Sequence, residues 1–176
     1  MEQVILVDRQ DVATGVMEKM EAHRRGLLHR AFSVFVFNDN GEMLLQQRAM
    51  DKYHSGGLWT NTCCSHPRPG EDTAAAASRR LEEEMGFTTA LTEVFSFTYQ
   101  ADFDNGLSEH EFDHVFVGHH NGPVQPDASE VSSHAYWSME KIGLALAEQP
   151  GLFTAWFRIA FPRINEWWRK NGQLAK

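Results

Sequence analysis

Two apolar runs on either side of a tight-turn signal constrain the fold of this chain most. Residues 29–49 read HRAFSVFVFNDNGEMLLQQRA, with Val, Phe and Leu crowding both sides of NDNG. Runs rich in β-branched and aromatic residues favour strands, and an Asn-Gly step between two such runs is typical of a hairpin turn. The stretch therefore predicts a β-hairpin.

The segments around this hairpin alternate between strand and helix patterns. Residues 74–86, AAAASRRLEEEMG, predict a helix that Asp72 or Thr73 caps and Gly86 ends. Pro162 is expected to kink a long C-terminal helix or to start a new turn in it. We expect strands at 4–8, 94–103, 111–120 and 133–138, and further helices at 139–149 and 152–170. This order predicts an α+β fold with a mixed β-sheet sandwiched between α-helices.

Composition narrows the class of protein. The 176 residues suffice for one domain, and a net charge of −8 without a block of Lys or Arg argues against nucleic-acid binding. No apolar run approaches the roughly 20 residues that span a bilayer, and MEQVILVDRQ is unlike a signal peptide. We therefore expect a cytoplasmic protein in a reducing compartment, without a disulfide framework.

Both cysteines stand side by side, at Cys63 and Cys64 in TNTCCSHPRPGE, with His66 two residues later. A disulfide, a metal site and a reactive thiol are the three explanations to weigh. A structural zinc site is usually closed by four Cys or His ligands, and no second cysteine pair exists to complete one. A reactive thiol, or a buried structural cysteine, remains.

Three histidines and two glutamates form a candidate metal set. His23 and His29 lie six residues apart, a spacing that matches neither a helix face nor a strand face, and surface positions would explain them individually. Glu109 and Glu111 share one face of a strand if the strand includes both. Together with His66 they offer three nitrogens and two or more oxygens, which suit Mn²⁺, Mg²⁺ or Zn²⁺ in five- or six-fold coordination.

The helix RRLEEEM contains two charge pairs at i,i+4, Arg79–Glu83 and Arg80–Glu84. One explanation is a solvated surface with weak ion pairs. The other is a row of carboxylates that holds a divalent cation beside a phosphate, because Mg²⁺ takes one or two carboxylates together with substrate oxygens.

The motifs WTNTCCSHP, RRLEEEMGF and YQADFDNGLSEHEFDHVF occur in an order and spacing that resemble the type I isopentenyl-diphosphate isomerases, divergent members of the Nudix superfamily. The resemblance extends from EKMEAH near the N-terminus to FTAWF near the C-terminus. It implies a single Nudix-like isomerase domain over residues 1–176, with a core of about 28–165.

The chain departs from the general Nudix box G-x5-E-x7-R-E-U-x-E-E-x-G-U, in which U is apolar. Aligned on Gly86, the box places Ser65 at its first glycine and Arg80 at its second glutamate. Glu71, Arg79, Glu83, Glu84 and Phe87 match it. A missing carboxylate weakens the case for diphosphate hydrolysis and agrees with a family that keeps the diphosphate intact.

The resemblance implies conversion of isopentenyl diphosphate to dimethylallyl diphosphate in isoprenoid biosynthesis, through protonation to a tertiary carbocation and loss of another proton. It implies Cys64 and Glu111 as the acid/base pair, with Cys63 pointing away as a small apolar filler. Tyr99 matches a tyrosine that hydrogen-bonds this glutamate. Trp156 matches an indole whose face stabilises the cation.

The resemblance also implies the ligands of the substrate and the metals. Lys19, Arg48, Lys52 and Arg80 match the family's contacts to the diphosphate. Glu84 and the Cys64 carbonyl would hold Mg²⁺ against it. A further divalent metal, Mn²⁺, Mg²⁺ or Zn²⁺, would occupy the site made by His23, His29, His66, Glu109 and Glu111.

The expected partner is thus a small prenyl diphosphate, with no nucleic acid, no membrane and no obligate protein partner. Two alternatives stay open at this point. A Nudix-type diphosphate hydrolase would share the fold, the Mg²⁺ and the phosphate contacts. A non-catalytic metal-binding or interaction module would explain the histidines but not Cys64, Tyr99 and Trp156.

Overall fold

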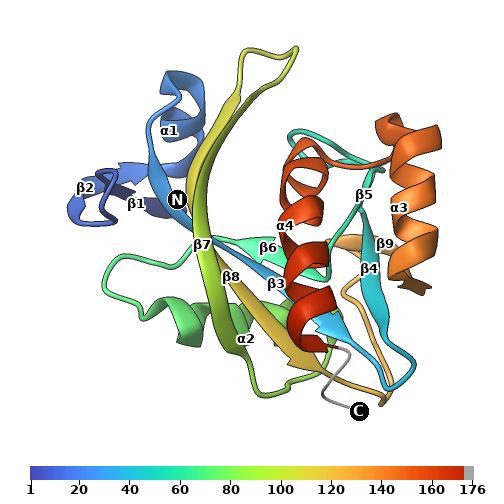
Figure 1. Cartoon of the computed structure of the whole chain (residues 1–176). Helices are drawn as coiled ribbons and strands as arrows, with labels where there is room; N and C mark the ends of the chain where they lie inside the picture. Colours follow the sequence, from blue (N-terminus) through green and yellow to red (C-terminus); the bar gives the residue numbers. More distant parts are fainter. Residues whose placement is uncertain (173–176) are drawn as a thin grey trace.

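The computed structural model describes residues 1–172, which form a mixed β-sheet with helices on both faces (Figure 1). The α+β fold expected from the order of the segments is confirmed. The strands are β1 Gln3–Val7, β2 Ala13–Glu18, β3 His29–Phe37, β4 Glu42–Arg48, β5 Trp59–Thr60, β6 Cys63–Ser65, β7 Thr92–Asp102, β8 Ser108–His119 and β9 Val131–Ser138. The helices are α1 Lys19–Arg25, α2 Thr73–Met85, α3 Met139–Glu148 and α4 Ala155–Asn171, with a 3₁₀ turn, η1, at Pro150–Leu152.

Strand β3 lies at the centre of the sheet. It pairs in parallel with β8 along its whole length, from His29↔Glu111 to Phe37↔His119, and antiparallel with β6. Strand β8 pairs antiparallel with β7, and β4 pairs antiparallel with β9 and β5. Metal-ligand candidates on β3 and β8 are therefore neighbours by register.

The hairpin predicted over residues 29–49 is wrong in its pairing. The turn forms, because the Asn38 N–H donates to the Glu42 carbonyl at 3.0 Å, but β3 and β4 pair only at Phe37↔Met43. Beyond that point Thr62 stands between them, where its hydroxyl accepts from the Val36 N–H at 2.9 Å and donates to the Leu44 carbonyl at 2.6 Å. The segment that contains both cysteines is thus inserted between the two strands.

The two faces of β3 belong to two hydrophobic layers. Phe35 and Phe37 pack with residues of α3 and α4. Phe32, Val34 and Val36 pack with residues of α2. Strand β6 follows the same alternation, with Cys63 in the α2 layer and Cys64 against the α4 layer. Adjacent cysteines therefore face opposite sides of the sheet, as expected.

Helix α2 begins and ends where the sequence predicts. The Asp72 side chain accepts from the Ala75 N–H at 3.0 Å, and Gly86 ends the helix with φ of 75°. A side chain at Gly86 would place its Cβ 2.3 Å from the Gln125 carbonyl oxygen, so glycine is required there for space as well as conformation. This holds Glu84, in the last turn of α2, in a defined position.

Several elements lie outside the sequence prediction. The short strands β2, β5 and β6 and the seven-residue helix α1 have no strong local pattern. Helix α4 runs without interruption from Ala155 to Asn171, so Pro162 does not divide it. Across residues 1–172, no helix combines the length and apolar character that crossing a membrane requires.

We predict that Leu81→Ala lowers the free energy of unfolding by about 2–5 kcal/mol, because Leu81 is fully buried between α2 and the sheet. Urea denaturation monitored by circular dichroism measures the change. Glu82→Ala, one residue further along the same helix at an exposed position, serves as the control and should stay within about 0.5 kcal/mol of wild type. Equal losses in both variants would contradict the layer assignment.

Candidate active and metal site

Two cavities adjoin at one end of the sheet and share Arg48, Tyr53, Cys64, Ser65 and His66. The outer cavity, of about 450 Å³, is lined largely by charged side chains. The inner one, of about 30 Å³, is lined by polar and aromatic groups, most of them buried. The arrangement separates a roomy, charged compartment from a narrow one. Besides the shared residues, the inner cavity is lined by His54, Tyr99, Glu109, Glu111 and Trp156.

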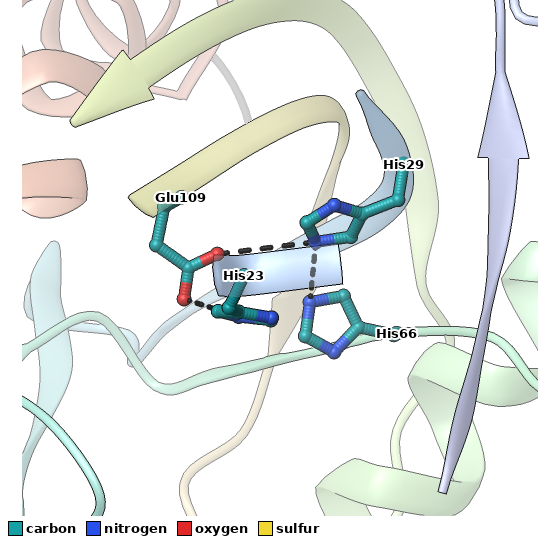
Figure 2. Close-up of side chains that lie close together, drawn as sticks. All are labelled: His23, His29, His66 and Glu109. Carbon is teal, nitrogen blue, oxygen red and sulfur yellow. Dashed lines mark hydrogen bonds and ion pairs between the residues drawn. The ribbon is translucent and has the colours of Figure 1, made fainter. Parts of the chain in front are cut away.

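Three imidazoles and a carboxylate converge beside the inner cavity (Figure 2). Ligand atoms of His23, His29, His66 and Glu109 lie within 4.8 Å of one another, and all four residues are buried. They come from α1, β3, the segment after β6, and β8. Only the fold brings them together, because their spacing in the sequence follows no single period.

Backbone carbonyls orient two of these rings. His23 Nδ1 lies 2.6 Å from the Lys19 carbonyl oxygen, and His29 Nδ1 lies 2.9 Å from the Leu27 carbonyl oxygen. A carbonyl only accepts, so each Nδ1 carries the proton and donates it. When neutral, each ring presents an Nε2 lone pair to the centre of the cluster, which is the arrangement of metal-binding histidines.

Strand β8 supplies both predicted carboxylates. Glu109 and Glu111 are buried on one face, while His110 between them turns the other way and lies 3.1 Å from the Gly26 carbonyl oxygen. The strand begins at Ser108, before the expected start at 111, and so includes both glutamates. Glu111 Oε2 lies 2.7 Å from His66 Nε2 and 3.2 Å from His29 Nε2. The fifth candidate ligand therefore adjoins the four-residue cluster.

Unsatisfied atoms in this cluster fit a cation. Glu109 Oε2 is buried and has no hydrogen-bond partner among the described residues. The Nε2 atoms of His29 and His66 face each other at 3.3 Å, a contact that needs a proton or a cation between the two lone pairs. Imidazoles and carboxylates together suit a divalent ion of the Mn²⁺ or Zn²⁺ type. The buried His/Glu group can hold a metal.

The charges of this cluster are mutually dependent. Burial would lower the pKa of His23, but the hydrogen bond and charge of Glu109 outweigh it and raise that pKa. Burial lowers the pKa of His66, which favours a neutral ring. Burial would raise the pKa of Glu111, but hydrogen bonds with His29 and His66 hold it well below its ordinary value. An ionised carboxylate thus faces imidazoles whose pKa values are shifted in opposite directions.

Cys64 and Glu111 face the same small cavity from different strands. The Cys64 thiol donates to Asn61 Oδ1 at 3.1 Å and lies 3.5 Å from Ser33 Oγ. Burial, reinforced by the nearby charge of Asp113, raises the pKa of this thiol well above its ordinary range. The Tyr99 hydroxyl donates to Glu111 Oε1. A protonated thiol and an ionised carboxylate therefore line the same narrow cavity.

Trp156 closes the inner cavity from α4. Its side chain is 5% exposed, and its indole Nε1 has no partner within residues 1–172. The Arg48 guanidinium lies 5.1 Å from the centre of a Trp156 ring. The indole thus adds an aromatic surface to a cavity that otherwise carries polar groups.

The four predicted diphosphate contacts, Lys19, Arg48, Lys52 and Arg80, all line the outer cavity. Arg68 and Arg79 line it as well, which gives this part of an acidic chain a locally positive lining. Glu84 joins them from α2, where burial raises its pKa. Arg80 Nη2 lies 3.6 Å from Glu84 Oε1, as the i,i+4 spacing predicts.

The expectation that Cys63 is only an apolar filler needs correction. Its side chain packs in the α2 layer, but its thiol donates to Glu84 Oε2 at 2.6 Å. A buried carboxylate requires such a donor, because an unpaired one is costly to bury. Each of the two adjacent thiols therefore contacts one cavity-lining network, on opposite faces of β6.

Two residues of the site have no signal in the sequence. His54 Nε2 lies 2.7 Å from Glu109 Oε1, and its ring stacks on Phe103 with centroids 4.5 Å apart. Glu130 contacts two cations of the outer cavity. Both residues stand in loops outside the quoted motifs, so only the folded structure reveals them.

Comparisons with known proteins identify the family of this chain. A family model described as the NUDIX domain matches residues 27–157. An isopentenyl-diphosphate Delta-isomerase of Pectobacterium atrosepticum is 54% identical over 95% of this chain and 93% of its own length. An isopentenyl-diphosphate Delta-isomerase of Burkholderia multivorans is 50% identical over 94% of this chain and 97% of its own.

Solved structures agree at the level of the fold. A Deinococcus radiodurans protein, DR0079, superposes with a TM-score of 0.76 over 92% of this chain and 98% of its own, at 17% identity. A MutT protein from Methanosarcina mazei gives 0.65 over 79% and 94%, at 21% identity. The resemblance inferred from the motifs is confirmed. The chain belongs to the isopentenyl-diphosphate Delta-isomerase family and has the NUDIX fold.

Proposed function

We propose that this protein isomerises isopentenyl diphosphate to dimethylallyl diphosphate, with Cys64 and Glu111 as the two proton-transfer groups. The observation that supports this most directly is the inner cavity, which Cys64, Tyr99, Glu111 and Trp156 line together. An unactivated alkene is a weak base, so its protonation needs a positioned acid and exclusion of water. A small cavity of about 30 Å³, lined mostly by buried side chains that include a thiol and two carboxylates, offers positioned acid and base groups beside the larger charged cavity.

The thiol and the carboxylate suit opposite roles. Cys64 is held protonated by burial and can donate or hold a proton at Sγ. Glu111 is ionised and can accept one, while the Tyr99 hydroxyl fixes the orientation of its carboxylate. The indole of Trp156 faces the same space and can stabilise a developing carbocation by about 2 kcal/mol. Together they provide an acid, a base and a surface for the intermediate.

The outer cavity would bind the diphosphate. Lys19, Arg48, Lys52 and Arg80 supply the positive charge, and a firm grip on the diphosphate positions the alkene in the inner cavity. Glu84 and the Cys64 carbonyl would hold Mg²⁺ there, and His23, His29, His66, Glu109 and Glu111 would hold a second divalent metal. When bound, these ions neutralise the charge of the diphosphate and of the buried carboxylates.

A diphosphate hydrolase of the same fold is the competing function. In the Nudix box its second glutamate would stand where this chain has Arg80. Here the Arg80 guanidinium lines the outer cavity between Glu83, Glu84 and Glu130. A cation at that position favours binding of the diphosphate over activation of water by metal-bound carboxylates.

The decisive experiment compares the two cysteines. Purified protein with isopentenyl diphosphate and saturating Mg²⁺ should form the acid-labile dimethylallyl product. We expect Cys64→Ala to lower turnover at least about 100-fold, the usual contribution of a general acid or base. Cys63→Ser should keep most of the turnover, because its hydroxyl lies on the other face of β6 and can still donate to Glu84. Equal loss in both variants would overturn the role of Cys64.

The His/Glu site should bind one divalent ion without a cysteine ligand. Anomalous scattering from metal-replete crystals should place the ion about 2.0–2.2 Å from the ligands if it is zinc. His29→Ala should remove the ion from the purified protein, as measured by elemental analysis. His110→Ala, a histidine on the opposite face of β8, is the control and should retain it. An ion bound to a cysteine sulfur would contradict the assignment.

Arg80→Glu should weaken substrate use without creating a hydrolase. A unit-charge contact at about 4 Å amounts to about 4 kcal/mol at an effective dielectric near 20, before desolvation is subtracted. A third of that is roughly a tenfold loss of affinity, so KM should rise and kcat/KM should fall. Arg158→Glu makes the same charge change at an exposed position of α4 and should leave both constants unchanged.

Phosphate release distinguishes the two reactions. Neither wild type nor Arg80→Glu should release phosphate or pyrophosphate from isopentenyl diphosphate at an enzymatic rate. If wild type does so, the hydrolase function replaces the isomerase. If Arg80→Glu matches wild type in KM, Arg80 makes no contact with the diphosphate.

A further inference from the structure

Glu130 is an acidic residue inside the cavity that would bind a polyanion. It lines the outer cavity, and no step of the isomerisation described above uses it. An anion at that place should repel a diphosphate, so its presence needs an explanation. The contacts of its two carboxylate oxygens suggest one.

Each oxygen of Glu130 faces a different predicted diphosphate contact. Oε2 pairs with Lys52 Nζ from the loop after β4, and Oε1 lies 3.6 Å from Arg80 Nη2 on α2. The side chains of Lys52 and Arg80 are each 20% exposed, and that of Glu130 is 26% exposed. The pairing therefore occurs in a partly desolvated place, where charges interact more strongly than on an open surface.

The backbone around Glu130 is anchored to the same two elements. Its N–H donates to the Asp127 carbonyl, and its carbonyl accepts from the Ala49 N–H, both at 3.0 Å. The Asp127 N–H in turn donates to the carbonyl of Glu84 near the end of α2, at 2.9 Å. Glu130 thus stands on a rigid connection between α2 and the loop that carries Lys52.

We propose that Glu130 is a positioning residue, which holds Lys52 and Arg80 in the orientation that receives the diphosphate. A lysine ammonium has three N–H donors and a guanidinium has five, so one contact with Glu130 leaves the others free for phosphate oxygens. Without it, two like charges on flexible side chains would separate into solvent, and the bound diphosphate would have to reassemble them. This inference rests on the proposed function, because it requires a diphosphate in the outer cavity.

The direction in which one substitution changes the affinity for pyrophosphate tests the proposal. Glu130→Gln keeps the shape of the side chain and removes one negative charge. If Glu130 is merely a nearby anion, the variant should bind pyrophosphate more tightly than wild type. If Glu130 orients the two cations, binding should weaken by roughly tenfold, the lower end of the loss known for residues that orient metal ligands.

Asp127→Asn is the matched control. Asp127 is exposed, lies three residues before Glu130, and its side chain accepts hydrogen bonds from Ser129 without an ion pair to Lys52 or Arg80. The Asp127→Asn substitution removes the same charge from the same loop. The affinity of this variant for pyrophosphate should equal that of wild type or rise slightly.

Calorimetric titration of the full chain with Mg²⁺ and inorganic pyrophosphate gives the affinities, and steady-state turnover of isopentenyl diphosphate gives kcat and KM. We expect Glu130→Gln to raise KM and weaken pyrophosphate binding together, with kcat changed less than threefold and an unchanged melting temperature. In a Lys52→Met background the loss caused by Glu130→Gln should shrink, because one of its two targets is gone.

The outcomes are distinguishable. If wild type binds pyrophosphate and Glu130→Gln binds it equally or more tightly, the positioning role is wrong and the proposed function stands. If wild type binds neither pyrophosphate nor isopentenyl diphosphate, the diphosphate pocket itself is wrong, and the role of Glu130 falls with it. If kcat falls while KM is unchanged, Glu130 acts on the chemical step and the proposal is overturned.

Discussion

The hydrogen bonds of Thr62 are the interaction on which the rest of the site depends. This side chain stands between β3 and β4, where it accepts from the Val36 N–H and donates to the Leu44 carbonyl. It therefore separates two strands that a tight turn would otherwise bring into direct pairing. The neighbouring Asn61 amide donates to the Val34 carbonyl at 2.9 Å. Because these polar groups replace a sheet ladder, the segment 60–65 enters the middle of the sheet, and Cys64 reaches the inner cavity instead of the surface.

The parallel register of β3 with β8 has the same importance for the metal cluster. His29 pairs with Glu111, and the alternation of β8 places Glu109 on the same buried face. Helix α1 and the segment after β6 then add His23 and His66 from two sides. Two glutamates and three imidazoles are buried together at a high cost in desolvation unless protons or a cation are shared among them. The fold alone thus brings together a buried His/Glu group that could hold a metal.

Local signals predict the parts of this fold whose causes are local. Helix α2 follows from Asp72, a run of helix-forming residues and Gly86, and the long strands follow from their apolar composition. The predicted hairpin pairing is wrong because β3 pairs with β6 and β8, whose residues lie 29 to 82 positions away, and a turn signal carries no information about them. In the site, the sequence motifs identify the cysteines, Tyr99 and the ligands of the His/Glu cluster. The catalytic and binding roles of these residues stay predictions. His54 and Glu130 stand in loops without a sequence motif, so only the folded structure shows that they line the site.

The acceptors that orient two of the histidines have one more consequence. His23 and His29 are aimed by peptide carbonyls of Lys19 and Leu27, not by side chains. A carbonyl is present whatever residue stands at its position, so substitutions at residues 19 and 27 alter neither acceptor. A substitution of either histidine removes its imidazole, but substitutions at residues 19 and 27 leave the orientation of the ring unchanged. The path of the main chain sets the direction of the lone pairs. Residues around the cluster can therefore be substituted without a change in the orientation of these two rings.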